Sequence, residues 1–111
     1  MTGENSENIF SAIPENLPEE LENLLASGGH FRFKRIVSRG HSSARNHWYD
    51  QDETEWVLLL SGSARLEFEN SRFVAMTPGD HLTIPPHCRH RVAWTTPDDD
   101  TVWLALYFSG T

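Results

Sequence analysis

The chain of 111 residues lacks most features that would place it in a specialised class at once. It has one cysteine, Cys88, so no internal disulfide can form and nothing indicates an oxidising compartment. Its apolar runs, such as residues 56–60, are far shorter than the roughly 20 residues of a membrane-spanning helix. The N-terminal residues lack the basic and apolar parts of a signal peptide, so we expect a cytoplasmic protein with no membrane partner.

A cluster of basic residues is also missing, although the chain has nine lysines and arginines. They are spread along the chain, so we expect no nucleic-acid partner. The formal net charge of -7 comes almost wholly from residues 1–29, which hold six glutamates and no lysine or arginine. Because residues 30–111 are nearly neutral, the net charge says little about a substrate.

The composition changes at Gly28-Gly29, and we divide the chain there into an extension and a barrel. Residues 1–29 are interpreted as an N-terminal extension with a short helix over 18–26. Pro18 stands near the start of that helix, acids fill its first turn, and leucines recur at helical spacing. Residues 30–111 contain seven or eight short stretches of strand character separated by turn signals. This pattern predicts an all-β antiparallel sandwich or barrel.

Oxygen-bearing side chains are concentrated in residues 49–55, and two histidines, His87 and His90, follow the Pro85-Pro86 turn. Glu55 opens an apolar strand, and an unpaired buried carboxylate costs several kcal/mol, so we expect a cation or a hydrogen-bond network beside it. Two other roles stay open. Glu55 could pair with an arginine, and His90 could be a hydrogen-bonded core residue.

The region around these histidines resembles the second motif of the cupin family, G-x5-P-x-G-x2-H-x3-N. Gly79, Pro85 and His90 stand in its register. His87 takes the place of the middle glycine, and Trp94 takes the place of the final asparagine. Strand alternation then puts Val92 and Trp94 on the same face as an inward-pointing His90.

The first cupin motif, G-x5-H-x-H-x3,4-E-x6-G, is matched at its end by Glu55 and Gly62. The chain therefore resembles a small single-domain cupin of the RmlC-like, cupin 2 conserved barrel type. The resemblance implies a double-stranded β-helix, or jelly-roll barrel, over residues 30–111, preceded by the short helical extension.

Cupins that bind a metal use the two histidines and the glutamate of the first motif and the histidine of the second. By this resemblance Glu55 and His90 are expected to be ligands of a divalent metal ion. Tyr49 and Gln51 occupy the two histidine positions and could offer a phenolate and an amide oxygen. A slipped register would use His47 and Tyr49 instead. These donor types suit Fe, Mn, Ni, Co or Zn.

His87 could replace a missing imidazole or act as a general base beside the metal, and we assign it the catalytic role. The favoured function is a metal-dependent enzyme acting on a small polar organic molecule inside the barrel, with the reaction unspecified. The alternative is a non-catalytic cupin that binds or senses a small ligand, which the loss of both first-motif histidines favours. Apolar positions within residues 56–60 and 102–108 leave a homodimer possible.

Overall fold

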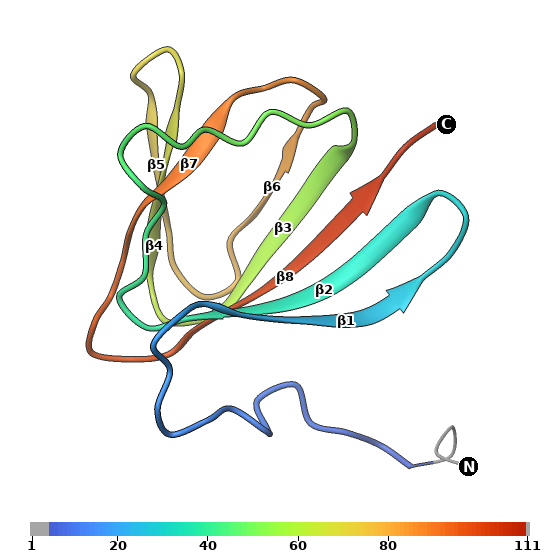
Figure 1. Cartoon of the computed structure of the whole chain (residues 1–111), viewed down its shortest axis with the longest axis vertical. Helices are drawn as coiled ribbons and strands as arrows, with labels where there is room; N and C mark the ends of the chain where they lie inside the picture. Colours follow the sequence, from blue (N-terminus) through green and yellow to red (C-terminus); the bar gives the residue numbers. More distant parts are fainter. Residues whose placement is uncertain (1–4, 111) are drawn as a thin grey trace.

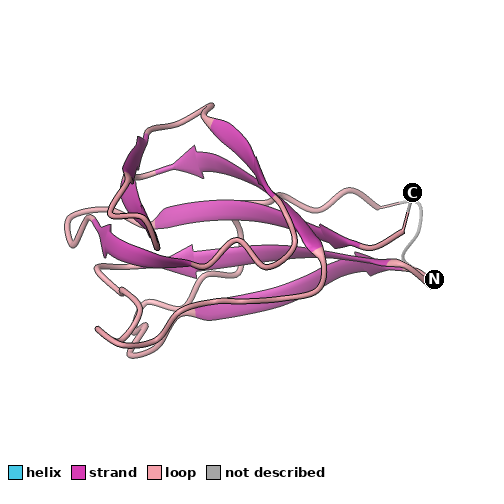
Figure 2. Cartoon of the chain, turned by 90° about the horizontal axis from the view of Figure 1, so that it is seen from above, coloured by secondary structure: helices cyan, strands magenta, loops and turns pink. Residues whose placement is uncertain are grey.

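The computed structural model describes residues 5–110, which form two antiparallel β-sheets facing each other (Figures 1 and 2). The larger sheet has the strand order β1-β2-β8-β3-β6, and the smaller has the order β5-β4-β7. No helix within residues 5–110 has the length and apolar character that crossing a membrane requires. The strands are β1 (Leu21–Ser27), β2 (Phe31–Ser38), β3 (Thr54–Ser61), β4 (Ala64–Phe68), β5 (Phe73–Met76), β6 (His81–Ile84), β7 (His90–Thr95) and β8 (Thr101–Phe108).

The all-β barrel predicted from the alternating pattern is confirmed. Strands β2 to β8 lie where alternation and turn signals predict them, between residues 30 and 108. Because successive side chains of a strand point to opposite faces, each strand sends every second residue into the space between the sheets. The resulting core consists of Val57, Leu59, Ala64, Leu66, Phe68, Met76, Ile84 and Trp103.

The helix predicted over residues 18–26 is wrong, because the second part of this segment is the edge strand β1. It pairs antiparallel with β2, with Glu22 opposite Ile36 and Leu24 opposite Lys34. Leu24 and Leu25 are 61% and 43% exposed, so the helical spacing of the leucines does not mark a buried face. Backbone pairing with β2 has overridden the local helix preference. The division of the chain at residue 30 stays a prediction, although β1 belongs to the same sheet as β2.

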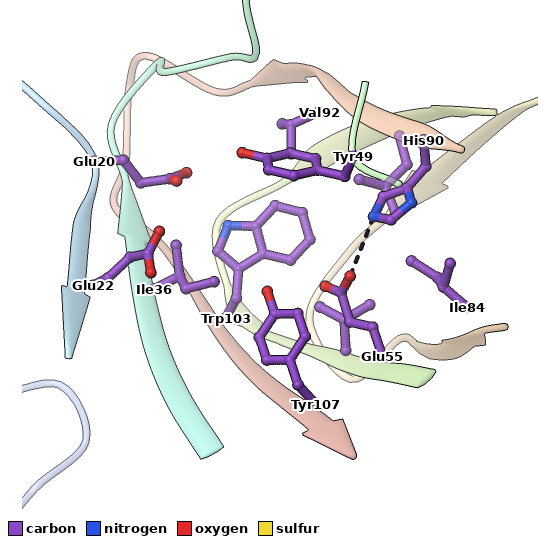
Figure 3. Close-up of a pocket in the computed structure, with 12 residues that line it drawn as sticks. Glu20, Glu22, Ile36, Tyr49, Glu55, Ile84, His90, Val92, Trp103 and Tyr107 are labelled. Atoms are coloured by element: carbon purple, nitrogen blue, oxygen red, sulfur yellow. Dashed lines mark hydrogen bonds and ion pairs between the residues drawn. The ribbon is translucent and has the colours of Figure 1, made fainter. Parts of the chain in front are cut away.

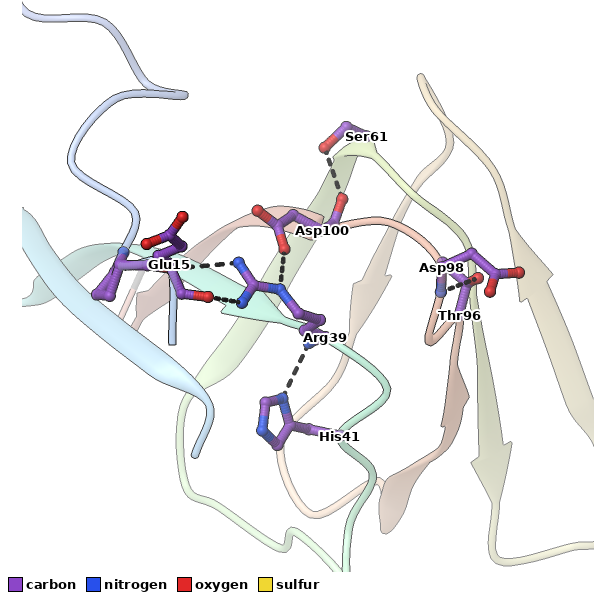
Figure 4. Close-up of polar contacts among 8 residues, drawn as sticks. Glu15, Arg39, His41, Ser61, Thr96, Asp98 and Asp100 are labelled. Atoms are coloured by element: carbon purple, nitrogen blue, oxygen red, sulfur yellow. Dashed lines mark hydrogen bonds and ion pairs between the residues drawn. The ribbon is translucent and has the colours of Figure 1, made fainter. Parts of the chain in front are cut away.

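Two arginines, one in β2 and one in the loop after it, hold the N-terminal segment, residues 5–20, against the larger sheet. Arg35 is only 6% exposed and donates hydrogen bonds to three backbone carbonyls of this segment. Arg39 donates to the carbonyl of Glu15 at 2.7 Å and pairs with Asp100 at 2.6 Å (Figure 4). The segment before β1 is therefore attached through charge-assisted hydrogen bonds to its backbone, which do not depend on its side chains.

Candidate functional site

A cavity with a volume of about 70 Å³ lies between the sheets (Figure 3). Strand alternation determines its wall, because it collects inward-pointing residues from β1, β2, β3, β4, β6, β7 and β8. Its polar groups are carboxylates, phenols and one imidazole, and the rest of the wall is apolar. The lining residues are Glu20, Glu22, Ile36, Tyr49, Glu55, Val57, Leu66, Ile84, His90, Val92, Trp103 and Tyr107.

Glu55 and His90, which the motifs predicted as site residues, meet at one end of this cavity. Glu55 begins the buried face of β3, and His90 is the first residue of β7. Both are buried, with 8% and 4% of their surface exposed. The Nε2 atom of His90 lies 3.2 Å from Oε1 of Glu55 (Figure 3). Two strands of different sheets thus bring a carboxylate and an imidazole into direct contact.

The orientation of the His90 ring is set by its other nitrogen. Nδ1 lies 2.8 Å from the carbonyl oxygen of Cys88, and because a carbonyl can only accept, Nδ1 carries the proton of that bond. Nε2 is therefore the nitrogen offered to Glu55. Burial lowers the pKa of His90, but the hydrogen bonds to Glu55 and the Cys88 carbonyl outweigh burial and raise it overall.

Gln51 and Tyr49 take different places beside this pair. Gln51 donates from Nε2 to Oε1 of Glu55 at 3.0 Å, so its amide lies next to the carboxylate. Tyr49 exchanges backbone hydrogen bonds with His90 at 2.7 and 3.2 Å. Its side-chain hydroxyl points away from the imidazole, toward the far end of the cavity (Figure 3). His47, the residue of the slipped register, packs its ring against Tyr49 at 5.0 Å and does not line the cavity.

His87, to which the sequence analysis gives the catalytic role, lies outside the cavity lining. Its side chain is 62% exposed and its Nδ1 and Nε2 atoms lie 2.8 and 3.1 Å from carboxylate oxygens of Asp50 and Asp52. Hydrogen bonding to Asp50, with the charges of both aspartates, raises the pKa of His87. Its backbone has a φ of 60°, the left-handed conformation that the glycine of the motif would adopt freely.

Replacing His87 with glycine is expected to raise the melting temperature by about 2–5 °C at pH 8, since left-handed strain is relieved and exceeds the entropy cost of glycine. The gain should shrink at pH 5. The raised pKa of His87 means that its pairing with the aspartates stabilises the native protein at low pH and is lost as pH rises through that pKa. Thermal unfolding at both pH values measures the difference.

Ser71 provides the control for this prediction, because it also has a positive φ, of 64°, but no titrating side chain. Ser71→Gly should raise the melting temperature equally at pH 5 and pH 8. A His87→Gly gain that does not depend on pH would contradict the assigned ion pairs.

The predicted face of Val92 and Trp94 is right for one residue and wrong for the other. Val92 lines the cavity, as expected from an inward His90. Trp94 is 40% exposed, because β7 carries an extra residue at this point in its pairing with β4, where Leu66 faces Val92 and Arg65 faces Trp94. Such a bulge reverses which face the following side chains occupy.

Four polar or aromatic residues that line the cavity were not singled out as site residues from the sequence. Glu20 and Glu22 come from the segment expected to be a helix, and their carboxylates point into the cavity (Figure 3). Trp103 and Tyr107 lie on β8, and Tyr107 stands opposite Glu55 in the pairing of β3 with β8. Alternation along residues 101–108 would have placed these two aromatics on one face. The inward position of the two glutamates could not be predicted from the sequence, because it depends on the pairing of β1 with β2.

Burial and neighbouring charges also shift the pKa values of Glu20 and Tyr107, two lining residues that the sequence did not indicate. Burial raises the pKa of Glu20, and the charge of Glu22 raises it further, against the effect of a hydrogen bond from Ser38. Burial, together with the charges of Glu55 and Glu22, raises the pKa of Tyr107 well above its usual range. Tyr107 is therefore a neutral phenol that can donate a hydrogen bond at any pH of interest.

The pair formed by Glu55 and His90 fits a divalent metal ion. Two ligand atoms about 2.1 Å from one ion are separated by about 3 Å when the angle between them is near 100°, close to the 3.2 Å observed. Metal-binding histidines usually donate from the ring nitrogen that does not bind the metal to a carbonyl or carboxylate, and Nδ1 of His90 donates in this way to the Cys88 carbonyl. No group of three His, Cys, Asp or Glu side chains converges within residues 5–110. Gln51, whose amide nitrogen donates to Glu55, would have to turn its amide over to offer its oxygen as a third metal ligand.

Comparison with known proteins agrees with this fold and these motifs. The cupin domain family matches residues 35–107, which contain strands β3 to β7, all of β8 but its last residue, and both motif segments. The chain belongs to the cupin family. None of the curated proteins compared with it gives a significant match.

Among solved structures, a protein of Ralstonia eutropha JMP134 described as "a putative mannose-6-phosphate isomerase" is 40% identical, with a TM-score of 0.90. The match covers 95% of this chain and 98% of that one. A cupin superfamily protein of Desulfitobacterium hafniense DCB-2 has a TM-score of 0.73 at 18% identity, covering 88% and 84% of the two chains. A cupin 2 conserved barrel domain protein of Salinispora arenicola CNS-205 has a TM-score of 0.65 at 22% identity, covering 82% and 76%. The last two show the fold alone.

Proposed function

We propose that this cupin is a metal-dependent enzyme that transfers a proton on a small polar organic molecule held in the cavity. The observation that carries the proposal is the contact of Glu55 with His90, 3.2 Å apart and buried, at one end of the cavity. Buried pairs of titratable groups in a cavity are the usual form of a site for acid–base chemistry.

The roles of the residues follow from their contacts. Glu55, His90 and Gln51 would hold the divalent metal, which when bound supplies positive charge that polarises a substrate carbonyl or hydroxyl oxygen. Only Oε1 of Glu55 contacts both His90 and Gln51, which leaves its second oxygen as the proton acceptor. Tyr107, kept neutral by burial, donates a hydrogen bond to a substrate oxygen from the neighbouring strand. The apolar wall excludes water, which strengthens these interactions.

The relative from Ralstonia eutropha supports an isomerisation as the reaction class. That protein is described as "a putative mannose-6-phosphate isomerase", and it is 40% identical over nearly the whole of both chains. Interconversion of an aldose and a ketose moves one proton between adjacent carbons and a second proton between the oxygens on those carbons, so it requires a base, an acid and polarisation of the carbonyl. The end of the cavity formed by Glu55, His90 and Tyr107 offers groups for each of these tasks.

Metal analysis of the purified protein tests the proposal. We expect close to one divalent metal ion per chain, falling to less than a tenth in the double variant Glu55→Ala and His90→Ala, because both strong donors are removed. The double variant Glu69→Ala and His81→Ala is the control, since both residues are exposed and lie outside the cavity lining. Wild-type protein that neither contains nor takes up Fe, Mn, Co, Ni or Zn would contradict the proposal.

A second candidate is a non-catalytic module that binds a small ligand. The observation in its favour is that Tyr49 turns its hydroxyl away from the Glu55–His90 pair, so neither first-motif histidine position supplies an imidazole there. If the metal-loaded protein binds a small ligand but does not convert it to a product, the protein is this binding module and not the enzyme.

The homodimer stays a prediction. The exposed leucines of edge strand β1 support it, whereas β3 and β8, proposed from sequence as dimer strands, lie inside the larger sheet.

A further inference from the structure

The charges of the cavity wall do not balance at the end farthest from His90. Glu22 pairs with Lys34, with Oε1 and Nζ 3.0 Å apart. Within residues 5–110, Glu20 makes no ion pair with a lysine or an arginine and accepts its hydrogen bond from the hydroxyl of Ser38 at 2.6 Å, with His41 the one basic side chain whose charge lowers its pKa. The Glu55 carboxylate at the other end already contacts His90. One negative charge, that of Glu20, is therefore left without a compensating cation in the ion pairs of this wall.

In the part of the chain that the structure describes, residues 5–110, no lysine or arginine lines the cavity. Two basic side chains beside the wall, Lys34 and Arg32, lie over the ring of Tyr107 and are already paired with Glu22 and Glu53, respectively. A phosphate group would enter a wall that presents carboxylates and would lack the arginine or lysine that phosphate recognition requires. The cavity wall therefore disfavours the binding of a phosphorylated ligand.

Aromatic side chains complete the surroundings of Glu20 and Glu22. Tyr49, Trp103 and Tyr107 stand between these glutamates and the Glu55–His90 pair, and the hydroxyls of both tyrosines point into the cavity (Figure 3). Aromatic faces attract organic cations as well as apolar groups. The volume of about 70 Å³ corresponds to about five water molecules, so the enclosed part of a ligand has few heavy atoms.

We infer that the ligand of this cavity is a small organic cation, a hydroxy-carbonyl compound that carries a primary amine, with its ammonium group between Glu20 and Glu22 and its carbonyl oxygen at the Glu55–His90 end. The inference rests on the proposed function, because it supplies the substrate class for the same site. The ammonium compensates the unpaired charge of Glu20 and meets the aromatic wall. The oxygen lies where proton transfer takes place.

The test compares three probes with the same three-carbon skeleton and different charge. Serinol carries an ammonium at pH 7, glycerol has a hydroxyl in its place, and glycerol 3-phosphate is an anion. Titrations of the metal-loaded protein, followed by amide chemical shifts, should give serinol a dissociation constant at least tenfold lower than that of glycerol. Glycerol 3-phosphate should cause no shift in the residues that line the cavity. Added salt should weaken serinol binding and leave glycerol binding unchanged.

Variants assign this preference to the two glutamates. Glu20→Gln and Glu22→Gln should each reduce the advantage of serinol over glycerol by about tenfold or more, while the affinity for glycerol changes little. Glu19→Gln is the matched control, because Glu19 is exposed, adjacent to Glu20 and outside the lining. It should keep the full preference for serinol.

Equal affinity for serinol and glycerol, tighter binding of glycerol 3-phosphate, or no shifts with any probe would each overturn the inference. A preference for serinol that persists in both glutamate variants would overturn it as well. These outcomes are separate from the metal analysis. A preference for serinol in a protein that neither contains nor takes up a divalent metal would contradict the proposed function and leave this inference intact.

Discussion

Gly62→Ala is expected to lower the free energy of unfolding by about 2–5 kcal/mol. Gly62 lies between β3 and β4 with a φ of 82°, where an L-residue is strained by about 1–2 kcal/mol. A Cβ atom there would lie 2.3 Å from Oγ1 and 2.6 Å from Cα of Thr101. Thr101 is completely buried at the start of β8, so its backbone has no room to move away, and overpacking adds about 1–3 kcal/mol.

Gly79→Ala is the matched control, because it isolates the backbone strain from the steric clash. Gly79 has a φ of 97°, but a Cβ atom would meet no atom within 4 Å. Its substitution should lower stability by about 1–2 kcal/mol, the strain alone. Equilibrium unfolding in urea compares the two variants. Equal losses in stability would contradict the assigned contact with Thr101, and failure of only the Gly62 variant to fold would agree with it.

The two glycines explain why the motifs predicted the barrel well. Gly62 closes the first motif and Gly79 opens the second, and both adopt backbone conformations that a side chain disfavours. Such positions depend on local geometry, so a sequence pattern can report them. Strand alternation is equally local, and it located β2 to β8. What alternation could not report was the bulge in β7, which reverses the direction of Trp94 and depends on pairing with β4.

The candidate site was likewise predicted from the sequence only where local motifs report its residues. Glu55 and His90 were predicted from motif positions, and the structure brings them within 3.2 Å. Glu20 and Glu22 reach the cavity only because β1 pairs with β2, a contact between segments about 14 residues apart. Local features of residues 18–26 favour a helix, and hydrogen bonds to another strand decide otherwise. The end of the cavity that is proposed to select the ligand is therefore the end that sequence alone could not predict.

Arg35→Ala is expected to lower the free energy of unfolding by about 2–4 kcal/mol and to release the N-terminal segment. The Arg35 guanidinium is buried and donates to three backbone carbonyls of that segment. It also donates to the side chain of Asn23 in β1 at 2.6 and 3.0 Å. Hydrogen bonds from a charged donor contribute about 1.5–3 kcal/mol each, and carbonyls that become hydrated recover part of that loss.

The Arg35→Ala substitution should increase local opening of the N-terminal segment as well as lower the overall stability, because Arg35 connects the segment that carries Glu20 to the sheet. Hydrogen exchange in residues 9–27 of the Arg35→Ala variant should accelerate more than in the core strand β3, since β1 is an edge strand. Arg65→Ala is the control, because Arg65 also lies in a strand but is exposed. It should change stability by less than about 0.5 kcal/mol.

This variant also tests how the extension serves the cavity. The cupin domain match begins at residue 35, so Glu20 and Glu22 lie outside it, although they line the same cavity as Glu55 and His90. If Arg35 positions the extension, Arg35→Ala should weaken serinol binding while the metal content of the folded protein stays unchanged, because Glu55 and His90 lie on β3 and β7. Loss of metal together with serinol binding would instead mean that the two ends of the cavity depend on one another. Unchanged exchange in residues 9–27 would show that the buried guanidinium does not hold the segment.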